Sequence, residues 1–360
     1  ANVVRWEMRT RTFLRTTEFL WQEGHTAHAS VNEALEETMK MLEVYRSFAE
    51  ECVAMPVIAG EKPENERFPG AVATYSIEAM MQDGKALQAG TSHFLGTTFS
   101  AAQNIKFQNA EGQQELAQTT SWGMSTRMIG GLIMVHGDDD GLRVPPRVAP
   151  YQIVVVPMLR DNDEDAAIVD YCTDLVSQLN ALDLFREPVR ALLDKRPAKA
   201  ATKRWGWVKK GAPIVIEVGG RDVAGGNVSV IRRDQLYRED GKLDSQIVAK
   251  GDFVAGATSI LTDIQQALFA DAKGRLDSNI DSSISSLEAL KAYFDASAKP
   301  GWALVQWSKP TGDALDKVVQ WLKGEKLTLR NVPSDAVAAD GACIFTGDAA
   351  VERVLVGRSY

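Results

Sequence analysis

The sequence predicts an α/β protein of two or three domains, and three observations support this prediction. The chain has 360 residues, which is enough for several buried cores. Near its start, the segment 4–25 has the side-chain alternation of two neighbouring strands. From Gln152 onward, short apolar strand-like runs alternate with helical ones. We therefore expect a strand hairpin first, then a parallel or mixed α/β sheet, and a small α/β unit at the end.

The segment 4–25 is expected to form two adjacent strands joined by a short loop between Met8 and Phe13. Alternate side chains of an extended chain share a face, so Arg5 and Glu7 lie together on the first strand. One face of the second strand combines a cation, aromatic rings, a carboxylate and an imidazole: Arg15, Thr17, Phe19, Trp21, Glu23 and His25. Arginines bind phosphates and aromatic rings stack on bases, so this face is interpreted as a binding surface for a polyanion with a flat ring, such as ATP.

The remaining elements of the first domain follow from periodicity and capping signals. The expected elements are a helix over Ser30–Cys52 with Ser30 as its cap, a helical stretch at Tyr75–Met81, an extended segment at Gln88–Phe94, a strand at Thr119–Trp122, a close-approach or turn position at Gly123, and an apolar helix over Ser125–Val135 with Arg127 in its first turn. The proline-rich run Pro145–Pro150 predicts a linker, and we place the first domain boundary there.

The second half of the chain predicts two further α/β domains. The expected elements are strands at Ile153–Val156, near Val189 and at Pro213–Val218, a helix over Ala166–Leu182, a helical passage from Val254 to Asp295, and strands at Ala303–Trp307 and Ala342–Phe345.

Composition excludes several classes of protein. No apolar run reaches the roughly 18 residues of a membrane span. The net charge of −8 argues against a general nucleic-acid coat. Three scattered cysteines form no disulfide framework and favour a reducing cytoplasm.

Three local features have competing interpretations. The segment Lys195–Lys210 has seven Lys or Arg residues, no acid, and Trp205 and Trp207 between the cations. It is either a solvated basic loop or a surface for RNA. His25 and His28 lie three residues apart, which turns them to opposite faces of a strand, so we expect no metal site there. Ser92–His93 lacks the nucleophile elbow of a hydrolase.

Three motifs together carry a resemblance to a known family: 4–7 with 15–25, Ala86–His93 and Thr120–Gly130. In this order and at this spacing they resemble the proline–tRNA ligase family of class II aminoacyl-tRNA synthetases, of the archaeal and eukaryotic-like type. The resemblance covers the whole chain. It implies a partial class II antiparallel-sheet catalytic domain at 1–148, an α/β anticodon-binding domain at 149–253, and a small α/β C-terminal domain at 254–360.

The resemblance also implies an activity and its residues. The expected reaction attaches L-proline to tRNA(Pro) through a prolyl-adenylate, uses ATP and Mg²⁺, and releases pyrophosphate and AMP. By resemblance, the catalytic residues are Arg5 and Arg127, and the ATP-binding residues are Arg5, Glu7, Arg15, Phe19, Gln88, Thr91, Ser125 and Arg127. The expected proline-binding residues are Arg5, Trp21, Glu23, His25, Phe68, His93, Ser121, Trp122 and Gly123. Lys203 and Arg221 are the expected anticodon contacts.

The chain departs from the family's pattern in two places. Motif 1 and the Thr-x-Glu loop would precede Ala1, so this piece alone is expected to be defective, whereas the full-length protein is expected to be a cytoplasmic homodimer. Relatives often hold zinc with four cysteines, but here only Cys343 occupies such a position and Thr346 replaces its partner. We expect no zinc. The chain keeps the family's terminal Tyr360.

Two rival hypotheses stay open. The first is a non-catalytic tRNA-binding or regulatory paralogue of the synthetase. The intact set Arg5, Arg15, Gln88, His93 and Arg127 argues against it, because a binding-only protein needs no grip on ATP. The second is a ligase that activates another small amino acid, such as alanine or cysteine.

Overall fold

The computed structural model describes residues 3–6, 8 and 10–360, without the side chains of residues 3–6. The chain forms two compact units. The first comprises Ala1–Glu51, Met55–Val135 and Lys273–Tyr360, and the second comprises Cys52–Ala54 and His136–Ala272. No helix among the described residues is long and apolar enough to cross a membrane.

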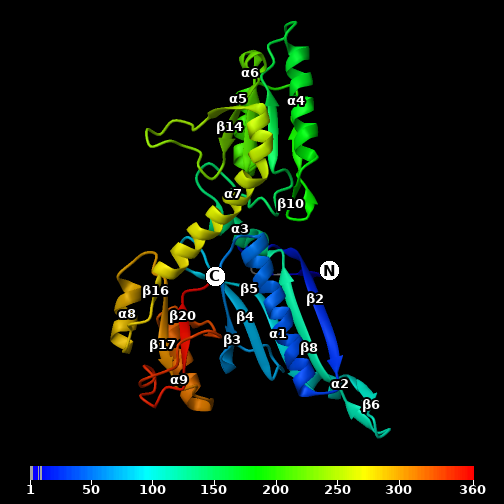
Figure 1. The fold of residues 1–360 in the computed structure, drawn as a ribbon. Helices are drawn as coiled ribbons and strands as arrows, with labels where there is room; N and C mark the ends of the chain where they lie inside the picture. Colours follow the sequence, from blue (N-terminus) through cyan, green and yellow to red (C-terminus); the bar gives the residue numbers. More distant parts are fainter. Residues whose placement is uncertain (1–2, 7, 9) are drawn as a thin grey trace. The chain divides into compact units, whose positions relative to one another are not determined.

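The first unit is built on a seven-stranded sheet (Figure 1). Its strands lie in the order β1 (Val3–Trp6), β2 (Glu18–His28), β8 (Gln118–Ser125), β5 (Ala86–Gly96), β4 (Ala73–Met80), β3 (Val57–Glu61) and β19 (Val332–Pro333). Every neighbouring pair is antiparallel. The expected pairing of the first two strands is confirmed, with Arg5 opposite Phe19. Strand β2 begins only at Glu18, so the connection extends beyond the Met8–Phe13 loop that we expected.

One face of this sheet is covered by α1 (Val31–Ser47), which continues as a π-helical turn, η1 (Phe48–Cys52) (Figure 1). The expected cap is confirmed: Ser30 accepts from the Glu33 amide, and Glu33 accepts from the Ser30 amide in return. The buried face of α1 includes Leu42 and Tyr45, and Ser92 of β5 donates to the Thr38 carbonyl oxygen at 2.7 Å.

The helix expected at Tyr75–Met81 is wrong, because this segment lies in strand β4. In Ala73–Met80, Thr74, Ser76 and Glu78 alternate with larger or apolar residues, which is the period of a strand rather than a helix. Gly123 lies inside β8 and makes no turn.

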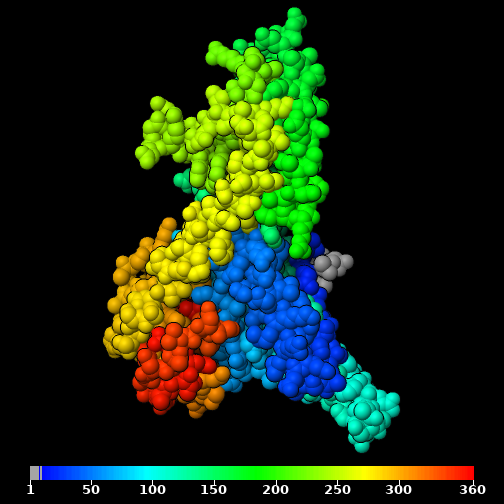
Figure 2. Space-filling view, viewed as in Figure 1, coloured from blue at the N-terminus to red at the C-terminus, as the bar shows by residue number. Residues whose placement is uncertain are grey.

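Smaller elements complete the part of the first unit that contains the seven-stranded sheet. They are η2 (Glu64–Glu66), α2 (Thr98–Gln103), the hairpin of β6 (Lys106–Gln108) and β7 (Gln114–Leu116), and the start of α3 (Arg127–His136), whose last residue belongs to the second unit. The β6–β7 hairpin projects from the surface of this unit (Figure 2).

The C-terminal residues of the first unit form a second sheet of four strands. Its order is β16 (Ile280–Asp281), β17 (Trp302–Trp307), β20 (Glu352–Gly357) and β18 (Thr328–Leu329), and it packs with α8 (Leu287–Asp295) and α9 (Gly312–Gly324). The strand expected at Ala342–Phe345 is wrong: the last strand lies later, at β20. Tyr360 lies against the first sheet, where its hydroxyl donates to Asp83 and its ring lies 4.6 Å from the Arg11 guanidinium.

A buried ion triad joins the two sheets of the first unit. Glu78 of β4 accepts from Arg330 at 2.6 Å and from Lys62 at 3.1 Å. Burial by itself raises the pKa of the Glu78 carboxyl, but the two cations outweigh this effect and lower the pKa to about 2. Burial and the Arg330 charge lower the pKa of Lys62. Arg330 lies between β18 and β19, so the triad ties the C-terminal segment to the first sheet.

The second unit is built on a mixed five-stranded sheet, as expected. Its order is β12 (Ala191–Leu193), β9 (Ile153–Pro157), β13 (Ile214–Val218), β14 (Asn227–Arg232) and β15 (Gln246–Ala249). The first three strands are parallel, and β14 and β15 are antiparallel. The other elements are α4 (Asp165–Asn180), the pair β10 (Asp183–Leu184) and β11 (Glu187–Pro188), α5 (Ala200–Lys210), α6 (Gly220–Gly225) and α7 (Lys250–Ser278), of which residues up to Ala272 belong here.

Candidate active site

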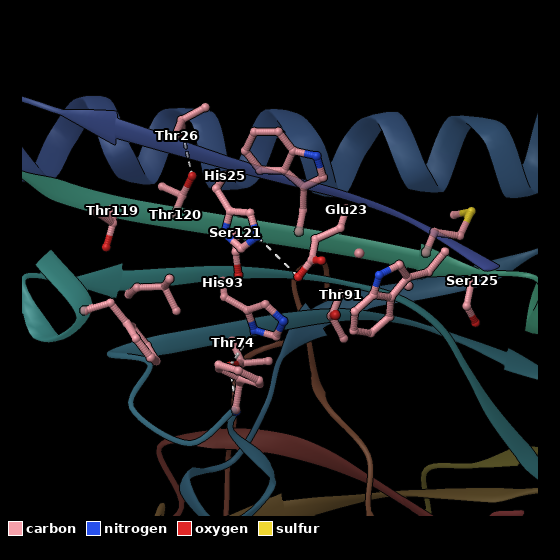
Figure 3. Close-up of a pocket in the computed structure, with 18 of the residues that line it drawn as sticks. Glu23, His25, Thr26, Thr74, Thr91, His93, Thr119, Thr120, Ser121 and Ser125 are labelled. Carbon is pink, nitrogen blue, oxygen red and sulfur yellow. Dashed lines mark hydrogen bonds and ion pairs between the residues drawn. The ribbon is translucent and has the colours of Figure 1, made fainter. Parts of the chain in front are cut away.

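The first sheet has a cavity of about 1040 Å³ on the face that points away from α1 (Figure 3). In β2, Gln22 accepts a hydrogen bond from Tyr45 of α1, so its neighbours Trp21 and Glu23 point to the other side of the sheet. From Glu18 to Glu23, exposed and partly buried side chains alternate, and Phe19, Trp21 and Glu23 are the partly buried ones. The volume suits a nucleotide together with a small second ligand.

The cavity brings together thirteen of the residues that the sequence singled out. Its lining includes Phe19, Trp21, Glu23, His25, Phe68, Gln88, Thr91, His93, Ser121, Trp122, Gly123, Ser125 and Arg127. They come from β2, β5, β8, the start of α3 and the loop before β4. All thirteen line one cavity, and their roles as site residues stay predictions.

Two of these residues share the cavity because of a β-bulge. Gln88 and Thr91 are three apart on β5, and strict alternation would turn them to opposite faces. The pairing with β4 shifts, however: Gly90 lies opposite Ile77, and Gln88 lies opposite Glu78, which leaves Ala89 as the extra residue. A bulge of this kind re-aims the following side chains, so both residues line the cavity.

Arg15 lies outside the strand to which it was assigned. Strand β2 begins at Glu18, so Arg15 and Thr17 precede it, and Arg15 lines a smaller cavity of about 270 Å³. The two cavities share Phe19, Ser125 and Arg127. The loop with Arg15 packs on α3, where a Cβ on Gly130 would lie 1.9 Å from the Phe13 oxygen. Arg15 therefore lies next to the main cavity. Its place there is due to the loop before β2 and not to the side-chain alternation of the strand.

Two expected residues are described only in part or not at all. The backbone of Arg5 pairs with that of Phe19, so Arg5 starts beside the cavity, but its side chain lies outside the described residues. Glu7 also lies outside the described residues. Their expected contacts with ATP stay predictions.

The cavity combines both signs of charge. Glu23 and His25 lie 3.3 Å apart (Figure 3), and Glu66, Arg67 and Arg127 also line the walls. Among the residues that the structure describes, no group of three or more His, Cys, Asp or Glu side chains is arranged to hold a metal ion. The cations provide sites for phosphates or a carboxylate, and Glu23 and Glu66 can accept from an ammonium group.

Arg127 is held at the junction of α3 and the sheet. Its backbone amide donates to Ser125 Oγ at 3.3 Å, and its guanidinium donates to the Gln88 carbonyl oxygen at 3.4 Å. These contacts place a positive charge between the two cavities. A fixed cation there can stabilise negative charge that develops on a bound phosphate.

His93 is the buried imidazole of the cavity. It is 8% exposed, and burial lowers its pKa to about 4, so the ring is neutral at pH 7. The Phe68 ring lies 4.9 Å away. The two rings form one wall of the cavity.

Sequence reasoning missed Thr74, Glu66 and Arg67 in the lining. Thr74 was missed because the following segment, Tyr75–Met81, was taken for a helix, although the alternation of polar residues in β4 was visible in the sequence. Glu66 and Arg67 lie at the end of the loop before β4, where no periodicity marks a functional position.

The basic segment of the second unit is largely helical, and some of its cations already have hydrogen-bond partners within the protein. Residues 200–210 form α5, in which Arg204 donates to both carboxylate oxygens of Glu217, and Trp205 is 40% exposed. Lys203 needs a correction. Its side chain is buried and its ammonium donates to the Asp194 carbonyl oxygen at 3.0 Å, which opposes the expected contact with RNA. Arg221 is exposed in α6.

Cys343, the one cysteine at a position where relatives were expected to hold zinc, has hydroxyl groups as neighbours. The Ser308 and Thr346 hydroxyls lie 3.0 Å apart. Burial raises the pKa of the Cys343 thiol, but hydrogen bonds from these hydroxyls and from the backbone of Ser308 and Phe345 together outweigh burial and lower it. Structural zinc needs four thiolate or imidazole ligands, and this donor set does not fit it.

Comparisons with known proteins identify the domains and the relatives of this chain. The model of the tRNA synthetase class II core domain (G, H, P, S and T) matches residues 2–136, and that of the anticodon binding domain matches residues 152–248. A proline–tRNA ligase of Sphingomonas elodea is 74% identical over 361 aligned residues, which cover all of this chain and 71% of that protein. The chain belongs to the proline–tRNA ligase family.

Other proline–tRNA ligases support this assignment at lower identity. Those of Novosphingobium aromaticivorans and Bdellovibrio bacteriovorus are 63% and 48% identical, each over all of this chain and 70% of the relative. The match to the class II core ends at residue 136, so the cavity and the Arg127 junction lie inside the synthetase core of this proline–tRNA ligase family member.

Proposed function

We propose that this protein attaches L-proline to tRNA(Pro) in two steps, through a prolyl-adenylate that forms in the cavity of the first sheet. The observation that carries the proposal is the convergence in one cavity of thirteen residues named from the resemblance to the family. The volume, the paired charges and the aromatic walls support an ATP site next to a site for a small amino acid.

In the first step, the proline carboxylate attacks the α-phosphorus of ATP, an oxygen–phosphorus bond forms, and pyrophosphate leaves with the electrons of the broken bond. Arg127 and Arg15 are proposed to hold the outer phosphates, and Arg5 the α-phosphate. Catalysis then rests on positioning and on fixed positive charge, without a covalent intermediate on the protein. The prolyl group passes in the second step to the terminal ribose of tRNA, and AMP leaves.

Each ligand has its proposed contacts. Phe19 stacks on the adenine, Glu7 accepts from its amino group, and Gln88, Thr91 and Ser125 contact the ribose or phosphates. Proline is enclosed by Trp21, Phe68, His93, Ser121, Trp122 and Gly123. The same pocket is lined by Glu23 and His25. Mg²⁺ would accompany ATP, held by substrate phosphates, its own waters and at most one or two carboxylates, and would neutralise charge on the departing pyrophosphate.

Residues 1–148 are proposed as the catalytic domain, 149–253 as the anticodon-binding domain and 254–360 as the C-terminal domain. The family-model matches at 2–136 and 152–248 support the first two. Arg221 and the exposed cations of residues 195–210 are proposed to contact the anticodon loop, with Trp205 available for stacking. The three free cysteines support a reducing cytoplasm, and a homodimer is proposed for the full-length protein.

Proline-dependent ATP–pyrophosphate exchange on the full-length gene product tests the proposal. We expect exchange with proline that Arg127→Ala abolishes while the variant stays folded. Exchange that prefers alanine or cysteine would assign another amino acid. No exchange from a folded protein that binds tRNA would support the non-catalytic paralogue.

A further inference from the structure

The wall formed by Phe68 and His93 is organised by the hydroxyl of Thr74. The Phe68 amide donates to Thr74 Oγ1 at 3.0 Å, and Thr74 Oγ1 lies 3.0 Å from His93 Nδ1. Thr74 is 2% exposed, and in Figure 3 its side chain lies directly beside the His93 ring. One buried hydroxyl therefore contacts both members of the wall.

This arrangement selects one tautomer of His93. A hydroxyl has one hydrogen to donate and two lone pairs. If His93 Nδ1 carried the proton, Thr74 would accept from both partners, and its own buried hydrogen would have no acceptor, which is costly. If Nδ1 is bare, Thr74 accepts from Phe68 and donates to His93, and all three groups are satisfied. The proton of His93 then lies on Nε2.

The neutral state of His93 makes this choice matter. A doubly protonated imidazole donates from both nitrogens and has no tautomer to select, but burial keeps this ring neutral at pH 7. With Nδ1 bonded to Thr74, Nε2 is the nitrogen that can meet a ligand in the cavity. An Nε2–H group donates to an oxygen, whereas a bare Nε2 would accept from a donor.

We propose that Thr74 is a positioning residue that fixes His93 as the Nε2–H tautomer, so that the wall donates a hydrogen bond to an oxygen of the bound amino acid. Its bond to the Phe68 amide also holds the Phe68 ring against His93. The ligand assignment rests on the proposed function, but the tautomer assignment does not. Thr74 acts through its neighbours and is not itself a catalytic residue.

Nitrogen NMR on protein labelled with ¹⁵N only at histidine tests the tautomer directly. The chain has four histidines, and His93→Gln identifies the His93 signals. At pH 7 we expect one protonated nitrogen, Nε2, and one bare nitrogen, Nδ1. Thr74→Val removes the hydroxyl at nearly constant shape and should yield a mixture of tautomers, whereas Thr74→Ser should retain the wild-type pattern. An Nδ1–H or doubly protonated ring in the wild type would overturn the proposal, as would an unchanged pattern in Thr74→Val.

Pyrophosphate exchange on the full-length gene product tests the consequence for binding. Thr74→Val should raise the KM for proline roughly three- to tenfold, the worth of about one hydrogen bond, and leave the KM for ATP unchanged. Thr74→Ser keeps the hydroxyl and should have the wild-type KM for proline. An equal rise in both KM values, or a fall in kcat alone, would indicate a general structural defect and contradict the positioning role. If the wild type shows no proline-dependent exchange, the proposed function fails, while the NMR result still decides the tautomer.

Discussion

The two large sheets of this protein place polar groups in opposite ways. The antiparallel sheet of the first unit is packed by α1 on one face, and its other face carries the cavity with Glu23, His93 and Thr74. In the sheet of the second unit, β9 and β13 are buried along their whole length, with apolar clusters on both sides. An antiparallel sheet can leave one face for chemistry, whereas a parallel one covered by helices offers only its ends and rims.

The difference also decides where buried charge is found. In the first sheet, strand β4 carries Glu78, which forms a buried ion triad with Lys62 and Arg330. In the second sheet, Glu217 and Arg204 pair near the end of β13, and Arg221 is exposed just after it. The following predictions test this contrast, from the largest expected effect to the smallest.

Glu78→Gln should lower the free energy of unfolding by about 3–5 kcal/mol, because it leaves two buried cations without their shared carboxylate. Chemical denaturation measures the change. Glu325→Gln removes a carboxylate that pairs with Lys291 near the surface and serves as the control, with little change expected. Equal effects of the two substitutions would show that the triad is not a special feature of the first sheet.

Arg127→Ala should reduce pyrophosphate exchange about 10²- to 10³-fold, because a fixed cation aimed at the phosphates contributes on this scale. Initial rates at saturating ATP and proline measure the loss. Arg221→Ala, on the second unit, should leave this exchange unchanged. A substantial loss from Arg221→Ala would break the division of roles between the sheets.

His93 should make stability depend on pH between 6.5 and 4. Its pKa is lowered from 6.5 to about 4 in the fold, so the unfolded chain binds more protons in this window. Stability is therefore complete above pH 6.5 and falls by about 3 kcal/mol as pH decreases to 4. Denaturation of the wild type and of His93→Gln at several pH values in this range measures the free energy of unfolding. The decrease between pH 6.5 and 4 should be present in the wild type and absent from the variant.

The exposed His25 provides the control for that experiment. The His25 side chain is 63% exposed beside Glu23, and in His25→Gln the loss of stability between pH 6.5 and 4 that is due to His93 should persist. A pH dependence that survives in His93→Gln would assign it to other groups of the cavity.

Arg221→Ala should weaken tRNA binding by a few fold and reduce the slope of log affinity against log salt by about one, as for the loss of one phosphate contact. Filter binding at several salt concentrations measures both. Lys203→Met should leave the salt slope unchanged, because the Lys203 ammonium is buried against the Asp194 carbonyl oxygen. A loss of slope in Lys203→Met would restore this residue as an RNA contact.

The alternating and capped segments could be read from sequence. The strand containing Trp21 and Glu23, the Ser30 cap and the apolar strands β9 and β13 depend on local periodicity and hydrogen bonding, which neighbouring residues alone specify. At β4 the strand alternation was visible in the sequence but was misread as a helix, whereas the partners of Thr74 and Glu78 lie far away in the chain and could not be read locally.

By itself, the sequence determined the family, the order of the motifs and thirteen of the residues that line the cavity, because the residues of each motif follow one another along a short stretch of chain. Only the tertiary structure decided that Ala89 forms a bulge, that Arg15 lies in the adjoining cavity, that Lys203 is buried, and that Glu78 is shared by Lys62 and Arg330. Each of these depends on contacts between segments distant in sequence, and the energy of a buried charge or hydrogen bond is set by the partner that the fold brings to it.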